Sequence, residues 1–120
     1  MMKKIVKTKI ESLNDIKHYE SKAILSSNRL KYMEDDTLVI LSILDGYIRL
    51  KRQNTECEYI FTFKETNSKL CFSLKENNYK FNLDFKTDKL IITEDKITIK
   101  YTLEGIKYSY EVIIKEDLWS

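Results

Sequence analysis

Hydrophobic and polar residues alternate with a period of two through nearly the whole chain. Short polar clusters interrupt this alternation at brief, fairly regular intervals. No segment keeps the i, i+3, i+4 apolar spacing that an amphipathic helix needs. The pattern is typical of an all-β protein made of short strands joined by tight turns.

The polar clusters predict where the chain reverses. Asp45-Gly46 is the strongest position, because a type I′ hairpin turn needs a positive φ at both of its central residues. Asparagine, aspartate and serine favour turns at the other positions through local hydrogen bonds. The predicted turns are Leu13-Asn14, Ser27-Asn28, Asp35-Asp36, Asp45-Gly46, Gln53 to Thr55, Asn67-Ser68, Glu76-Asn77, Thr87-Asp88, Glu94-Asp95 and Glu104-Gly105.

A two-residue turn also fixes the register of the strands on either side of it. A slip of one residue turns a strand's whole apolar set to the other face of the sheet, so matched apolar pairs are informative. The consistent matches predict a single antiparallel up-and-down (meander) β-barrel of about eight to eleven short strands, closed because closure removes the sheet edges. Hairpin after hairpin, large apolar residues are predicted to face each other: Leu103 and Ile106, Tyr101 and Tyr108, Ile99 and Tyr110, Ile97 and Val112, Ile92 and Ile97, Leu90 and Ile99, Phe85 and Leu90, Leu83 and Ile92, Leu74 and Tyr79, Phe72 and Phe81, Phe63 and Phe72, Ile43 and Ile48, Leu41 and Leu50.

Length and composition fit one domain over residues 1–120. The chain is 42% hydrophobic and 33% charged, and its 21 basic and 19 acidic residues leave a net charge of +2. So small a net charge does not by itself indicate nucleic-acid binding, because groove binders usually carry a concentrated basic face. The longest apolar run, Leu38 to Leu44, is too short to span a bilayer, and lysines follow Ile5-Val6 too soon for a signal peptide. We therefore expect a cytoplasmic protein that does not enter a membrane.

Three segments of the chain resemble a known family. They are Asp45-Gly46-Tyr47-Ile48-Arg49-Leu50-Lys51-Arg52, Phe81-Asn82-Leu83-Asp84-Phe85-Lys86-Thr87 and Ile97-Thr98-Ile99-Lys100-Tyr101. In these segments the chain is similar to the YwiB-like family of small bacterial proteins of unknown function. The resemblance implies a calycin-like (lipocalin-type) β-barrel. It implies no activity.

Residues with catalytic or metal-binding chemistry are sparse. His18 is the only histidine, and alternation places it on the outer face. Cys57 and Cys71 are predicted to point to opposite faces, roughly 23 Å apart at about 3.3 Å per residue, so both should be free thiols. The acidic pairs Asp35-Asp36, Glu94-Asp95 and Glu116-Asp117 are expected to be solvated. The sequence therefore predicts no catalytic residue, no metal site and no cofactor.

The two ends of the predicted barrel differ in polarity. The end with the turns at 27, 45, 67, 87 and 104 carries only apolar inward residues, including Leu103, and is expected to be a packed plug. The opposite end carries an inward arginine among tyrosines. A cavity with a few convergent polar groups is a common ligand site. The candidate ligand-binding residues are Arg52, Tyr32, Tyr59 and Tyr79.

Three functions remain open. The first is a non-enzymatic binding module for a small, partly apolar ligand with an anionic or carbonyl group. The second is an interaction or structural domain with a solid core. The third, weak binding of single-stranded nucleic acid, would use the outward Tyr47, Arg49 and Lys51. An apolar outer patch also needs a cover, either a second copy of the chain or Leu118-Trp119; it comprises Leu38, Ile40, Leu44 and Tyr47.

Overall fold

In the computed structural model, which describes residues 2–117, each strand pairs with its neighbours in sequence. The first strand also pairs with the last, so the sheet closes without a free edge. Within the described range the structure confirms the predicted all-β meander barrel, and it contains no helix long and apolar enough to cross a membrane. The strands are β1 (Met2–Ser12), β2 (Asp15–Ser26), β3 (Arg29–Glu34), β4 (Thr37–Leu44), β5 (Tyr47–Gln53), β6 (Cys57–Phe63), β7 (Asn67–Leu74), β8 (Lys80–Ile92), β9 (Lys96–Leu103) and β10 (Ile106–Glu116).

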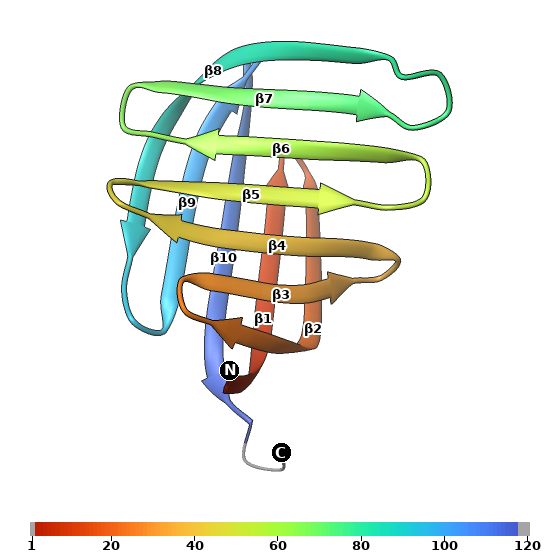
Figure 1. Ribbon diagram of the computed structural model, residues 1–120. Helices are drawn as coiled ribbons and strands as arrows, with labels where there is room; N and C mark the ends of the chain where they lie inside the picture. The colour runs from red at the N-terminus through yellow and green to blue at the C-terminus, as the bar shows by residue number, and fades with distance from the viewer. Residues whose placement is uncertain (1, 118–120) are drawn as a thin grey trace.

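Two corners shape the barrel. Strand β2 pairs with β1 from Asp15 to Leu25, but with β3 only from Ala23 to Ser26. Strand β8 pairs with β7 through its first half and with β9 through its second half. Figure 1 shows the result: β3 to β7 run across β1, β2, β9 and β10 at a steep angle, and β8 bends from one layer into the other. The two layers enclose one core, as in orthogonally packed sheets.

The predicted register is confirmed around four turns. Leu41 faces Leu50, Phe72 faces Phe81, and the pairings around 94–95 and 104–105 are also as expected. At the last of these turns, Glu104 has a φ of 50° and Gly105 a φ of 80°. Two consecutive positive φ angles are the geometry of a type I′ turn, whose twist matches that of the flanking strands.

The turn predicted at Asn67-Ser68 lies a few residues earlier, at 64–66. Phe72 consequently faces Tyr59 rather than Phe63. The cause is the buried Ser68 hydroxyl, which donates to the Lys64 carbonyl at 3.1 Å and accepts from the Lys64 amide at 3.0 Å. Such side-chain bonds to the backbone stabilise tight loops. Since the register moves by an even number of residues, the inward face of both strands is unchanged.

The turn predicted at Thr87-Asp88 is wrong. Strand β8 continues from Lys80 to Ile92, with a bulge between Thr87 and Lys89, so Phe85 does not face Leu90. Side chains on other strands keep this segment extended, because the Ser68 and Thr87 hydroxyls are hydrogen-bonded and Thr102 donates to Asp88 at 2.6 Å. Because the chain does not reverse at 87–88, each of the next two turns, at 93–95 and 104–105, lies at the barrel end opposite the one expected.

The core is filled from alternate positions of most strands. Burying each large apolar side chain contributes about 1.5–3 kcal/mol. Four rings, those of Phe61, Phe63, Phe85 and Tyr101, meet in the core at centroid distances from 5.1 to 6.3 Å. The residues that are fully buried and apolar are Val6, Leu30, Val39, Leu41, Ile48, Phe63, Ile97, Ile99 and Val112.

Candidate functional site

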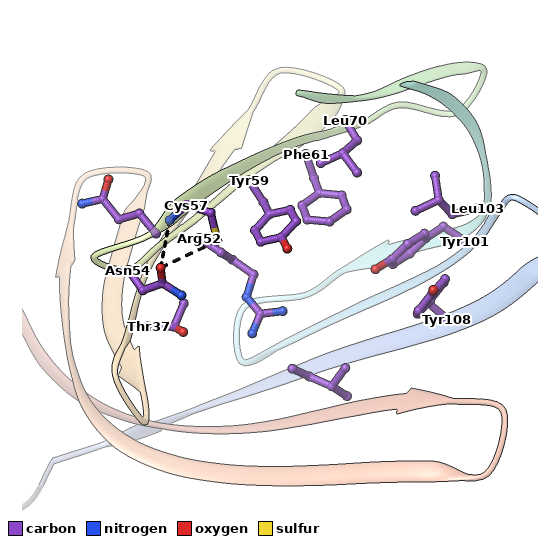
Figure 2. Close-up of a pocket in the computed structure, with 12 residues that line it drawn as sticks. Thr37, Arg52, Asn54, Cys57, Tyr59, Phe61, Leu70, Tyr101, Leu103 and Tyr108 are labelled. Atoms are coloured by element: carbon purple, nitrogen blue, oxygen red, sulfur yellow. Dashed lines mark hydrogen bonds between the residues drawn. The ribbon is translucent and has the colours of Figure 1, made fainter. Parts of the chain in front are cut away.

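A cavity of about 340 Å³, partly open to solvent, lies at one end of the barrel (Figure 2). The turn around 53–56 and the end of β9 form its rim. Its walls combine aromatic and aliphatic side chains with a single guanidinium. The lining residues are Ile10, Thr37, Arg52, Gln53, Asn54, Cys57, Tyr59, Phe61, Leu70, Tyr101, Leu103 and Tyr108.

Arg52 is the charged residue of this cavity. It follows Ile48 and Leu50 in the alternation of β5, so its side chain starts toward the barrel interior. Figure 2 shows the guanidinium extended away from its strand into the cavity. Nη2 lies 2.8 Å from Oε1 of Glu34, and the side chains of Arg52 and Glu34 are 26% and 1% exposed. Since a buried carboxylate needs a compensating charge, the two residues form one unit.

Two tyrosines complete the surroundings of Glu34. The Tyr110 hydroxyl donates to Glu34 Oε2 at 2.8 Å, and it is also hydrogen-bonded to the Tyr32 hydroxyl. Because Tyr110 gives its proton to the carboxylate, its oxygen must accept the proton of Tyr32. Burial raises the pKa of both phenols well above 10, and the negative charge of Glu34 adds to the shift. Both tyrosines are therefore protonated donors at neutral pH.

An aromatic wall faces the guanidinium. The Tyr59 and Phe61 rings stack at 6.4 Å, and the Tyr101 and Tyr108 rings stack at 5.1 Å. Burial raises the pKa of Tyr101 to about 12, partly offset by the positive charge of Arg52. The Tyr101 hydroxyl is thus neutral, and the wall presents ring faces against which a flat apolar molecule can pack.

The four candidate residues occupy different places. Arg52 and Tyr59 line the cavity. Tyr32 is buried and joins the site through Tyr110. Tyr79 lies in the connection before β8, is 53% exposed and contacts Phe81 rather than the cavity. Its carbonyl accepts from the Leu74 amide at 2.8 Å, but β8 begins only after it, at Lys80.

Sequence reasoning missed two parts of this site. Glu34 continues the inward series of Leu30 and Tyr32, so strict alternation would have found it, but it adjoins the exposed turn Asp35-Asp36. Leu103 lines the cavity instead of plugging the opposite end. Its misplacement follows directly from the false turn at Thr87-Asp88.

The remaining predicted residues fall as follows. His18 is exposed on the outer face, and the turn pairs Asp35-Asp36 and Glu94-Asp95 are solvated as expected. Asp117 is an exception, since it is only 8% exposed. It borders the groove at the corner where β2 and β3 separate, because β10 stays paired with β1 as far as Glu116.

The two cysteines are free, as predicted. Cys57 lines the cavity, whereas Cys71 faces Ile60 on the outer side of the sheet. The spacing estimated from the sequence was too large, because it placed Cys71 opposite Lys64. The shifted 64–66 turn accounts for that error.

Fold and cavity together define a small up-and-down β-barrel with an internal pocket open at one end. No family model matches the chain, and no curated protein matches it. Among solved structures it is similar to the crystal structure of the ywiB protein from Bacillus subtilis, with a TM-score of 0.62 and 14% sequence identity over 95% of this chain and 89% of that one. At this identity the likeness shows the fold. The barrel that the family resemblance implied is confirmed.

Proposed function

We propose that this protein is a non-enzymatic binding module that holds a small, partly apolar ligand inside the barrel. The observation that carries the proposal is the cavity of about 340 Å³ with Arg52 at its polar side and stacked aromatic rings at the other. The ligand's apolar part packs against the rings, and its anionic or carbonyl group faces the guanidinium. The volume falls within the range of small-molecule sites.

The alternative of a solid interaction domain has less support. A barrel of about eight strands is just wide enough for its own side chains or for one small ligand, and the diameter grows with the number of strands, so the ten strands of this barrel leave room for a small molecule. Here a cavity of about 340 Å³ lies at one end of the barrel, lined by the guanidinium of Arg52. Two unpaired cysteines support the cytoplasmic location that we propose for the protein.

Phenylnaphthylamine, a neutral dye that fluoresces in apolar surroundings, tests the proposal. We expect saturable binding of one dye per chain. Leu103→Trp places a bulky ring in the cavity and should weaken binding by about tenfold or more, which corresponds to about 1.4 kcal/mol. Ile113→Trp adds the same ring on the exposed outer side of β10 and serves as the matched control. No saturable binding, or equal weakening by both variants, contradicts the proposal.

One observation favours a second candidate function, weak binding of single-stranded nucleic acid on the outer face. Cross-strand pairing places Arg29, Ser42, Arg49, Thr62 and Lys69 in one row across β3 to β7. This row extends the basic strip predicted from β5 and suits a phosphate backbone. The ring of Tyr47 is already covered by the Lys64 ammonium at 5.2 Å, which leaves it less available for base stacking. Oligonucleotide affinity that falls steeply with salt and drops in Arg49→Gln would support this function; no binding at low salt would exclude it.

A further inference from the structure

Arg52 is not a free cation waiting for an anion. Its guanidinium already lies 2.8 Å from the carboxylate of Glu34, so the pair carries no net charge. The other residues that line the cavity carry apolar or polar side chains, and none of them is a lysine, arginine or histidine. Within the described residues the lining therefore offers an incoming anion no further positive side chain.

Glu34 is held in place from behind. It is 2% exposed, and Tyr110 donates to its second oxygen. Tyr32 in turn donates to Tyr110, and both tyrosines are fully surrounded by the core. A ligand cannot displace Glu34 into water without breaking this chain of buried hydrogen bonds, which is costly.

Only part of the guanidinium is used by this contact. Arginine has five N–H donors, and the ion pair engages Nη2. No hydrogen bond from Arg52 to another group is present among residues 2–117. The guanidinium reaches into the cavity that it lines, as Figure 2 shows. Its remaining donors are suited to a neutral acceptor.

Resting on the proposed function, we infer that the ligand of this cavity is an uncharged molecule that accepts a hydrogen bond from Arg52 through a carbonyl or similar oxygen. A carboxylate or phosphate would place a second negative charge beside the fixed carboxylate of Glu34, against a single positive charge. Repulsion between like charges is strong where water is scarce. A neutral carbonyl gains the arginine hydrogen bond without this repulsion.

Two matched dyes separate the possibilities. Prodan is a dimethylaminonaphthalene that bears a neutral propionyl carbonyl, and its fluorescence responds to polarity and hydrogen bonding. The corresponding dimethylaminonaphthoate has the same rings, with a carboxylate in place of the ketone. For the wild-type protein at neutral pH, we expect prodan to bind at least about tenfold more tightly than the naphthoate.

Glu34→Gln provides the decisive variant. It retains the size of the side chain and an oxygen that can accept from Tyr110, but it removes the negative charge. The naphthoate should gain about tenfold or more in affinity, while prodan changes by less than about threefold. In Glu34→Gln/Arg52→Met, where both charges are gone, the gain of the naphthoate should disappear. This double variant distinguishes the cavity arginine from lysines on the surface.

The outcomes are distinct. Equal binding of both dyes by the wild type overturns the inference, and so does a Glu34→Gln protein with an unchanged affinity ratio. If Glu34→Gln does not fold, the wild-type ratio alone decides. Binding of phenylnaphthylamine without binding of prodan overturns the inference and leaves the proposed function standing. Failure of phenylnaphthylamine to bind overturns the proposed function, and the inference with it.

Discussion

Tyr110→Phe tests whether the buried Glu34 depends on its tyrosine. The substitution removes one oxygen and keeps the ring, so packing in the core is preserved. It deprives the carboxylate of its 2.8 Å donor and the Tyr32 hydroxyl of its acceptor. Hydrogen bonds to charged groups contribute about 1.5–3 kcal/mol, and a buried polar group left unpaired costs about 1–3 kcal/mol. We expect a loss of about 3 kcal/mol in the free energy of unfolding.

Urea unfolding followed by far-UV circular dichroism measures this loss. For 120 residues, an unfolding entropy of about 2.1 cal/mol/K per residue makes 1 kcal/mol equivalent to about 4 °C, so the melting temperature should fall by about 12 °C. Tyr108→Phe is the matched control, two positions along the same strand. Its hydroxyl makes no hydrogen bond within the described residues, and the loss should stay near or below about 0.5 kcal/mol.

The comparison between the two variants decides the matter. Equal losses for Tyr110→Phe and Tyr108→Phe would refute the reasoning, because the Glu34 contact would then contribute nothing measurable. In a Glu34→Gln background the Tyr110→Phe loss should shrink toward about 2 kcal/mol, because the bond to the substituted side chain is then a neutral one worth about 1 kcal/mol, while the buried Tyr32 hydroxyl still loses its acceptor. An undiminished loss would mean that the charge of Glu34 is not what the tyrosine stabilises.

Three further predictions concern pH, thiols and association. The folded-state pKa values of the buried Tyr32, Tyr101 and Tyr110 lie above the ordinary value of 10, so the contribution of these tyrosines to stability should be fully present below pH 10. Above pH 10, ionisation of the unfolded chain should lower the free energy of unfolding by about 1.4 kcal/mol per pH unit for each of them, through pH 12 for Tyr101 and beyond for the other two. A free energy of unfolding that stays flat from pH 10 to 12 would contradict the burial of these phenols. Thiol titration of the denatured protein without reductant should find two free groups. In the folded protein, saturating phenylnaphthylamine should slow the reaction of Cys57 with a thiol reagent, measured in Cys71→Ser. The reaction of Cys71, measured in Cys57→Ser, should be unaffected. Equal slowing of both reactions would place the dye outside the cavity. If the apolar outer patch joins two copies, size-exclusion chromatography should detect a wild-type dimer and a Leu44→Glu monomer, whereas a monomeric wild type would exclude this interface.

The outer patch itself has the composition expected from the sequence. Leu38, Ile40, Leu44 and Tyr47 share the outer face of β4 and β5, and all four are half-buried. Their proposed cover remains a prediction, since Leu118-Trp119 lies outside the described residues. The dimer prediction above addresses the other cover.

Local sequence determined which residues face inward. Side chains alternate strictly along a strand, so the inward set is given by every second residue and is unchanged when the register shifts by an even number of residues. The hairpin between β6 and β7 illustrates this point. Its turn was predicted several residues too late. Tyr59, Phe61 and Phe63 nevertheless face the interior, because the pairing register shifted by an even number of residues. The register at Asp45-Gly46 and Glu104-Gly105 was equally local, because glycine accommodates the positive φ that each turn requires.

Tertiary contacts decided which inward residues meet and at which end of the barrel. Thr87-Asp88 has the composition of a turn, but Ser68 and Thr102, which lie 19 and 14 residues away, hydrogen-bond to it and keep β8 extended. That one difference moves Leu103 into the cavity. Tertiary contacts also decide that Glu34 is buried. A carboxylate next to two aspartates is expected to be solvated unless a cation and a hydrogen-bond donor are available to it in the interior. Arg52 and Tyr110 supply them from β5 and β10, and only the closed barrel brings these strands to opposite sides of the same carboxylate.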